Sequence, residues 1–211
     1  MARRFGKNKS ADEAVEETPV VVTGARHQGP WDSTERTAGD DPTYIDLGHL
    51  LVKVRPGLTL QMPTDGEGDE IGSAVLVTDD AALELRAFAA TRSGGLWDEV
   101  RDDLILEVER LDGQCEQVEG PYGAELHVRV PVEVEDATDA FQPSRIVGVE
   151  GPRWLLRATF LGDAGLNPSD EGILMDVLRD VIVVRGDEAR IPREALLLTL
   201  PDNATVISDE E

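Results

Sequence analysis

Residues 145–161, Arg-Ile-Val-Gly-Val-Glu-Gly-Pro-Arg-Trp-Leu-Leu-Arg-Ala-Thr-Phe-Leu, are the stretch of this sequence that decides the fold. Two apolar runs flank Gly151 and Pro152, which predicts a buried β-hairpin turned at this dipeptide. Alternation along the second strand predicts one face in the core and one face outside. The core face would hold Trp154, Leu156, Ala158 and Phe160, and the outer face would hold Arg153, Leu155 and Arg157.

Composition favours a single domain with tails, or two small domains, in a chain of 211 residues. Hydrophobic residues make up 40% of the chain and aromatic residues only 4%, so the core must consist mainly of Val, Leu, Ile and Ala. Each of the three Trp is therefore expected to be a packing anchor. We expect Trp97 and Trp154 to anchor the core, and Gly151 and Pro152 to fix the hairpin turn.

Charge and cysteine content exclude several classes of function. The net charge of −23 repels phosphate backbones and anionic membranes, so nucleic-acid and membrane partners are not expected. Cys115 is the one cysteine, which rules out an intramolecular disulfide and a cysteine metal site, and we interpret it as structural. No stretch is apolar enough for a signal peptide or a membrane span, so we expect a soluble, cytoplasmic protein.

Three regions follow one another along the chain. Residues 1–43 are polar and charged, which predicts a disordered N-terminal tail. Within that tail Gly29-Pro-Trp-Asp32 carries an aromatic residue that could dock on the domain, and the sequence leaves this open. Residues 44–201 form a single domain, and residues 202–211 form an acidic C-terminal tail.

The periodicity of apolar residues changes once within the domain and then changes back. Strands are expected over 50–54, 59–62, 73–77 and 83–88. Trp97, Val100, Leu104, Val108 and Leu111 then follow helical spacing, with Ser93 or the pair Gly94-Gly95 opening the helix and Gly113 ending it.

After the helix, strands are expected over 114–118 and 126–134, followed by the hairpin. A second helix should carry Ile173, Leu174, Val177 and Leu178 on one face, with Pro168 near its first turn. Strands at 181–184 and 196–200 close the domain. This order predicts an α+β fold in which a mostly antiparallel sheet has its two main helices packed on one face.

No group of residues predicts catalysis, a metal or a cofactor. His27, His49 and His127 show no metal-binding spacing, and no Gly-x-Ser-x-Gly nucleophile motif occurs. We interpret His127 as a solvated strand residue beside Glu125. The sequence therefore predicts a protein that is not an enzyme and holds no cofactor.

A group of arginines in the last third of an acidic chain is the one candidate binding feature. Its members are Arg145, Arg153, Arg157, Arg179, Arg185, Arg190 and Arg193, of which Arg145, Arg153, Arg157 and Arg185 are the candidate binding residues. Guanidinium groups bind carboxylates and other anions with a fork of donors, so this group could form an anion site or an interface for an acidic partner. The alternative is that these arginines pair with the chain's own Asp and Glu residues.

Several short motifs occur here in the order typical of one family. They are Gly29-Pro-Trp-Asp32, Asp46-Leu-Gly48, Arg86-Ala-Phe-Ala-Ala90, Gly95-Leu-Trp-Asp-Glu-Val-Arg101, Glu119-Gly-Pro-Tyr-Gly123, Gly148-Val-Glu-Gly-Pro-Arg-Trp154 and Leu178-Arg-Asp-Val-Ile-Val-Val-Arg-Gly186. With them the chain resembles the DUF3710 family, an uncharacterised actinobacterial family. The resemblance implies a cytoplasmic actinobacterial protein and carries over no activity and no catalytic residue. The order of elements also resembles Mog1/PsbP-like and secretion-chaperone-like sandwiches, which usually serve as non-catalytic binding proteins.

These observations favour a non-catalytic cytoplasmic interaction or adaptor domain with an unidentified protein partner and an oligomeric state that the sequence does not define. A second hypothesis is a small-molecule or anion-binding module that uses the arginine-bearing strand face. A third is an enzyme of a class that the motifs do not reveal.

Overall fold

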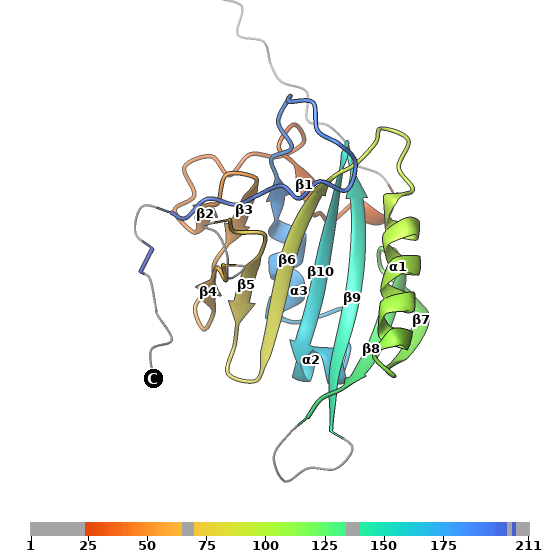
Figure 1. Cartoon of the computed structure of the whole chain (residues 1–211). Coiled ribbons are helices and arrows are strands. Elements are labelled where there is room, and N and C mark those ends of the chain that lie inside the picture. The colour runs from red at the N-terminus through yellow and green to blue at the C-terminus, as the bar shows by residue number, and fades with distance from the viewer. Residues whose placement is uncertain (1–23, 65–69, 134–139, 202–203, 206–211) are drawn as a thin grey trace, which may run out of the picture.

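A large antiparallel sheet organises the molecule in the computed structural model, which describes residues 24–64, 70–133, 140–201 and 204–205 (Figure 1). Its seven strands are, in spatial order, β4 (Thr59–Gln61), β5 (Ala74–Val77), β6 (Ala81–Ala89), β10 (Trp154–Gly162), β9 (Phe141–Gly151), β8 (Gly123–Pro131) and β7 (Gln114–Gly120). The predicted α+β class with a mostly antiparallel sheet is confirmed.

The hairpin of β9 and β10 forms as predicted, with Gly151 paired to Trp154. Pro152 and Arg153 make the turn, and Arg153 takes a left-handed φ of 64°. A Cβ at Gly151 would lie 2.0 Å from the ring of Trp154, so only glycine fits where the indole crosses the strand. Arg153 therefore belongs to the turn and not to the strand face on which we had expected it.

A second, smaller sheet packs beside the first and includes residues that we had assigned to the N-terminal tail. Its order is β1 (Trp31–Asp32), β11 (Ile182–Val183), β3 (Leu50–Lys53) and β2 (Tyr44–Asp46), with β1 parallel to β11. The predicted boundary at residue 44 is thus too late, because residues 24–43 are part of the folded domain. Residues 1–23 and most of the acidic segment 202–211 lie outside the described residues.

One buried hydrogen bond explains why the N-terminal segment docks. The indole Nε1 of Trp154 donates to Oδ2 of Asp32 at 2.7 Å, and both residues are buried. A buried indole needs an acceptor, and the hairpin itself does not supply one. Trp31 adds the ladder bond from its backbone N–H to the carbonyl of Val181, and the guanidinium of Arg36 stacks on its ring.

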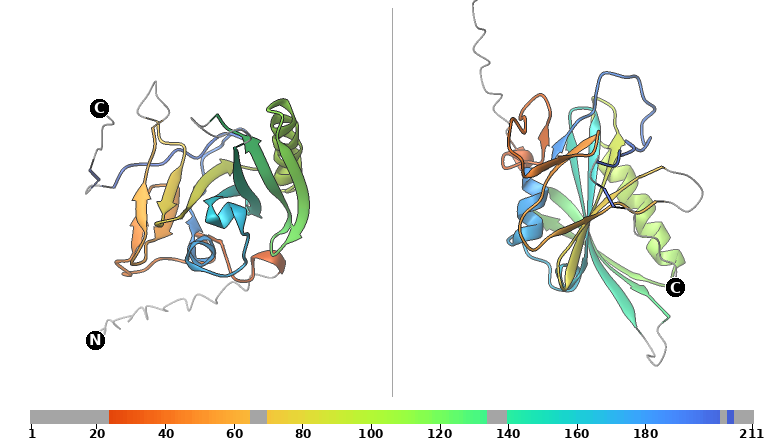
Figure 2. Two further views of the ribbon diagram at one scale, coloured as in Figure 1. Left: turned by 90° about the horizontal axis from the view of Figure 1, so that it is seen from below. Right: turned by 90° about the vertical axis from the view of Figure 1, so that its left-hand side faces the viewer.

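The helices α1 (Leu96–Arg110) and α3 (Ile173–Asp180) cover opposite faces of the large sheet, as Figure 2 shows. Leu155 packs in the cluster beneath α1, whereas Trp154 and Leu156 pack in the main core with α3. The prediction that both helices share one face is wrong because β10 is apolar on both sides. Alternation correctly predicted that Leu155 and Trp154 lie on opposite faces of the sheet, but Leu155 is buried and not solvated.

The long helix α1 lies where the spacing predicted it. Gly95, with φ of 88°, precedes it, and the carboxylate of Glu150 on β9 accepts the backbone N–H groups of Gly95 and Trp97, both at 3.0 Å. At the other end Asp112, not Gly113, adopts the left-handed conformation. Gly113 is needed for a different reason, because a Cβ there would lie 2.8 Å from the side chain of Val108.

Two later elements differ from expectation. Pro168 lies between the short helix α2 (Asp163–Leu166) and α3, so it is not in the first turn of the helix that carries Ile173. Residues 196–200 form no regular strand but continue the sheet through the bridges Phe88–Ala195 and Ile71–Leu198. None of the helices in the described ranges is both long enough and apolar enough to cross a membrane.

Candidate functional site on the open sheet face

Arg145, the first of the four candidate arginines, lies inside the molecule. Its Nε and Nη2 donate to the two carboxylate oxygens of Glu125, each at 2.8 Å. Its remaining donors reach Asp170 and the carbonyl of Ser169, both at 2.7 Å. Only 3% of its side chain is exposed. Arg145 therefore joins the connection between α2 and α3 to the sheet. All three nitrogens of its guanidinium group have acceptors among the described residues.

Arg153 and Arg185 hold two loops together. Arg185 donates from Nε to the carbonyl of Arg153 and from Nη1 to the carbonyl of Glu188, both at 3.1 Å. Arg153 in turn donates to the carbonyl of Gly186 at 3.0 Å. These bonds attach the hairpin turn to the segment that follows β11. The structure does not bring either residue together with Arg145 or Arg157.

Arg157 has a different environment, on the face of the sheet that α1 covers only in part. Its Nη2 is 3.7 Å from Oε2 of Glu84, and its guanidinium lies 5.9 Å from the ring centroid of Phe88. Its Nε is buried and has no hydrogen-bond partner among the described residues. A buried donor without a partner costs free energy, so Arg157 is less well satisfied in the fold than Arg145 is.

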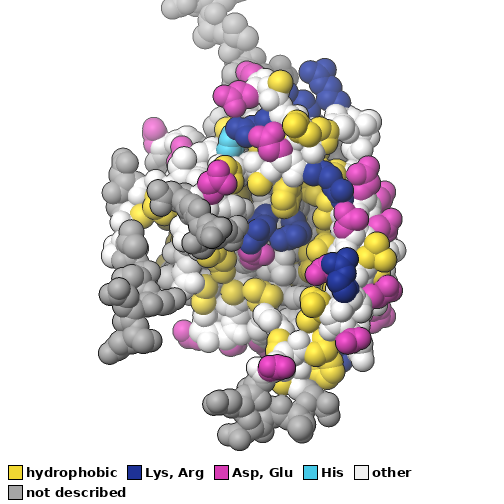
Figure 3. All heavy atoms as spheres, in the orientation of Figure 1, with side chains coloured by type: hydrophobic (Ala, Val, Ile, Leu, Met, Phe, Trp, Pro, Cys, Tyr) yellow, Lys and Arg dark blue, Asp and Glu magenta, His cyan; other side chains and the backbone are white. Residues whose placement is uncertain are grey.

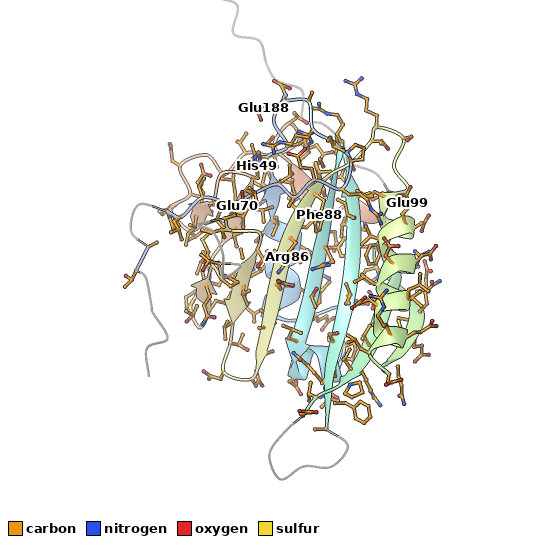
Figure 4. The ribbon with its side chains drawn as sticks, viewed as in Figure 1. His49, Glu70, Arg86, Phe88, Glu99 and Glu188 are labelled. Carbon is orange, nitrogen blue, oxygen red and sulfur yellow. The ribbon has the colours of Figure 1, made fainter. Side chains whose placement is uncertain are left out.

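Strand pairing places a second arginine beside Arg157. Arg86 on β6 is its direct register partner, and Arg86 donates from Nε to Glu84 at 2.9 Å. Two guanidinium groups thus share one carboxylate, which leaves one positive charge over. Figure 4 shows Arg86 and Phe88 on the same side of the sheet, and Figure 3 shows basic side chains gathered in the middle of this face between hydrophobic ones.

We define the open sheet face as the surface that these side chains share with their neighbours. It consists of Val75, Glu84, Arg86, Phe88, Arg157 and Leu197. Val75 is the register partner of Glu84 on β5. Leu197 is 38% exposed, and it falls beside Arg86 because Ala195 bridges to Phe88 two residues earlier. The face is therefore a basic centre with apolar flanks.

Burial lowers the pKa of Arg157 from its ordinary value; nearby Arg86 lowers it further, while Glu84 opposes the shift. Arginine stays protonated in spite of such shifts, so the group remains a cation that is short of counter-charge. A second carboxylate brought to this face would relieve the charge excess. What the arrangement can do chemically is to bind an anionic group with a fork of donors.

The helix α1 and the C-terminal segment border the open sheet face. Trp97 of α1 lies on Gly148, whose missing side chain admits the indole; a Cβ there would be 2.0 Å from the ring. Gly148 is also the register partner of Arg157, so α1 stands directly beside the basic centre. Across the face, Arg193 forms an ion pair with Asp103 of α1. The predicted anchors Trp97 and Trp154 are both buried, and Trp154 is completely so.

The sequence interpretation missed Glu84, Arg86 and Phe88 as site residues. Their alternation with Leu83, Leu85 and Ala87 did place them on one face of a strand. What the sequence did not show is that β6 pairs with β10, and this pairing is what sets Arg86 next to Arg157.

Glu125 and His127 also differ from the solvated face that we expected. Glu125 is only 3% exposed because Arg145 covers it, and its Oε1 is 2.9 Å from Nε2 of His127. Burial raises the pKa of the Cys115 thiol on the neighbouring strand. In the described part of the chain no three His, Cys, Asp or Glu side chains are grouped as a metal site would require.

Two cavities lie away from the open sheet face. One, of about 390 Å³, is lined by residues of α2, α3 and the turn between β5 and β6, including Phe160 and Met175 from the main core. A second, of about 380 Å³, lies by Gln114, His127 and Pro168. Neither is lined by Arg86 or Arg157, so the basic centre is not part of these two cavities.

Comparison with known proteins agrees with the resemblance noted from the motifs. A search of curated proteins finds no match. The family model described as "Protein of unknown function (DUF3710)" matches residues 29–206, which begin at the docked segment around Trp31 and include the whole open sheet face. The chain therefore belongs to the DUF3710 family, whose function is not known.

Proposed function

We propose that this protein is a non-catalytic interaction domain whose open sheet face binds an acidic, extended segment of a protein partner. The observation that carries the proposal is the pair Arg86 and Arg157, which share the single carboxylate of Glu84 while the Nε of Arg157 has no described acceptor. An incoming Asp or Glu side chain would supply the missing negative charge at the exposed parts of the two guanidinium groups, whose side chains are 20% and 31% exposed.

The shape and composition of the face favour an extended peptide over a small molecule. Small-molecule sites are usually concave cavities that enclose most of the ligand. Here the guanidinium groups instead lie on an open surface with Val75, Phe88 and Leu197 around them. A strand-like segment with alternating acidic and apolar side chains could place its carboxylates on the arginines and its apolar residues on these flanks.

The charge of the whole molecule makes such a site selective. At −23 the chain repels acidic partners at long range. Binding therefore depends on contacts made at the face itself, where Coulomb interactions are less screened than at a fully exposed surface. An acidic segment without apolar residues would gain less, because the flanks would stay uncovered.

Fluorescence anisotropy with a labelled ten-residue peptide of alternating Glu and Val tests the proposal, in about 0.15 M salt to screen long-range repulsion. A charge-assisted hydrogen bond contributes about 1.5–3 kcal/mol, so Arg157→Gln and Arg86→Gln should each weaken binding about tenfold or more. Arg110→Gln is the matched control, because Arg110 carries the same charge on an exposed part of α1 and, within the described part of the chain, pairs only with Glu107.

The proposal fails if the peptide binds Arg157→Gln as tightly as the wild type, or if Arg110→Gln weakens binding equally. Inorganic phosphate provides a second test. If phosphate binds the face at concentrations at which chloride does not, while the Glu-Val peptide does not bind, the face is a small-anion site and the peptide proposal is overturned. If phosphate does not compete, an extended acidic partner is supported.

A further inference from the structure

Building on the function proposed above, we infer that the chain's own acidic segment, residues 202–211, competes with the partner for the open sheet face. This segment reads Asp-Asn-Ala-Thr-Val-Ile-Ser-Asp-Glu-Glu. It combines the apolar pair Val206-Ile207 with carboxylates at 209–211. The carboxylates would supply the negative charge that the basic centre lacks, and the apolar pair could cover its apolar flanks.

The chain enters this segment at the border of the face itself. Leu196 donates its backbone N–H to the carbonyl of Ala87 at 2.9 Å, and Leu198 donates to Ile71 at 2.7 Å. Leu197 lies between these two ladder bonds and forms one flank of the basic centre. Residues 202–211 are therefore tethered at the edge of the site and not at a distant part of the molecule.

The backbone also turns where the acidic segment begins. The N–H of Ala204 donates to the carbonyl of Pro201 at 2.9 Å, a bond between residues three apart that is typical of a β-turn.

The length of the segment is sufficient to reach the arginines. At about 3.3 Å per residue, Pro201 lies no more than ~13 Å beyond Leu197, and Asp209 can extend ~26 Å from Pro201. Leu197 is one strand away from Arg86, which adds about 5 Å. The carboxylates at 209–211 can therefore return to Arg86 and Arg157 without any change in the described fold.

Charge complementarity is local and specific to this face. The described contacts of Arg145 already satisfy its fork with Glu125 and Asp170, so that residue offers no competing site.

A tethered segment at an effective concentration of about 1 mM lowers the affinity for a partner about tenfold if its own dissociation constant is about 0.1 mM. Only a partner that binds the face tightly enough to displace the acidic segment would then occupy it.

The test uses the full chain with isosteric neutral residues in the segment: Asp209→Asn, Glu210→Gln and Glu211→Gln combined. The Glu-Val peptide should bind this variant about tenfold more tightly than the wild type. The matched control combines Asp12→Asn, Glu16→Gln and Glu17→Gln, which changes net charge equally at the other end of the chain. The control should change affinity less than about twofold, because charges that are not bound at the face are screened by salt.

Each outcome separates this inference from the function on which it rests. Equal gains in both triple variants would show that only net charge matters and would overturn the inference. No gain in the 209–211 variant, with binding still lost in Arg157→Gln, would overturn the inference and leave the proposed function standing. No peptide binding even in the 209–211 variant would overturn both. Addition of Arg157→Gln to the 209–211 variant should abolish its gain.

Discussion

Arg145 and Arg157 lie on neighbouring strands of one sheet, yet their surroundings give them opposite roles. Arg145 faces the side covered by α2 and α3, has two carboxylates within 2.8 Å, and is 3% exposed. Arg157 faces the side of α1, is 20% exposed, and is 3.7 Å from a carboxylate that Arg86 also uses. The difference teaches that exposure alone does not identify an arginine that binds a ligand. The number of carboxylates that already neutralise its guanidinium group must also be counted.

The largest effect should come from Arg145. Arg145→Met leaves Glu125 buried without its cation, which should lower the free energy of unfolding by about 3–5 kcal/mol in urea denaturation. The double variant with Glu125→Leu should recover much of this loss, because no unpaired charge stays buried. A loss below about 1 kcal/mol would mean that Arg145 is as dispensable for the fold as we take Arg157 to be.

The next effect concerns the attachment of the N-terminal segment to the core beneath α3. Asp32→Ala removes the acceptor of the Trp154 indole, and a buried donor left unpaired costs about 1–3 kcal/mol. Asp32→Asn keeps an oxygen at that place and should cost less. Urea unfolding followed by tryptophan fluorescence measures both. If the two variants lose the same stability, the hydrogen bond to Trp154 is not what holds this segment.

A smaller effect is expected on the α1 side. Glu150→Ala removes the carboxylate that accepts two N–H groups at the start of α1, which should cost about 0.5–2 kcal/mol. Glu99→Ala is the control, since Glu99 is an exposed acid in the first turn of the same helix. Circular dichroism during urea unfolding should show a larger loss for Glu150→Ala. The opposite order would show that the helix dipole, and not capping, dominates there.

The smallest change in stability should come from Arg157 itself. Arg157→Met replaces a desolvated guanidinium, whose Nε already lacks a partner, with a flexible apolar side chain. Glu84 keeps Arg86 as its partner, so no unpaired charge is created. We expect the free energy of unfolding to stay within about 0.5 kcal/mol of the wild type or to rise. A loss above about 2 kcal/mol would make Arg157 a structural residue like Arg145.

Local patterns in the sequence accounted for much of the fold but not for this division between faces. Helical spacing located α1, and the dipeptide Gly151-Pro152 located the hairpin, because both depend on neighbours along the chain. The pairing of β6 with β10 joins distant segments, and no local pattern specifies it. For that reason Arg157 could be selected as a candidate, while Arg86 and Phe88 could not.

Docking of the N-terminal segment escaped prediction for a similar reason. Residues 24–43 are polar enough to predict disorder by composition. The bond between Asp32 and Trp154 depends on a buried indole that lies 122 residues further along the chain. Likewise, Glu125 looked solvated until Arg145 was placed on the adjacent strand. In each case a buried polar group is stabilised by one distant partner.

The contrast between the two arginines is tested most directly by the Nε–Hε resonances of their side chains in a ¹⁵N-correlated NMR titration with the Glu-Val peptide. The Nε of Arg157 has no described acceptor, whereas that of Arg145 already donates to Glu125. We predict that the Arg157 resonance shifts progressively as peptide is added while the Arg145 resonance stays in place. An Arg157 resonance that does not move at peptide saturation, or an Arg145 resonance that moves more, would contradict the assignment of binding to the open sheet face.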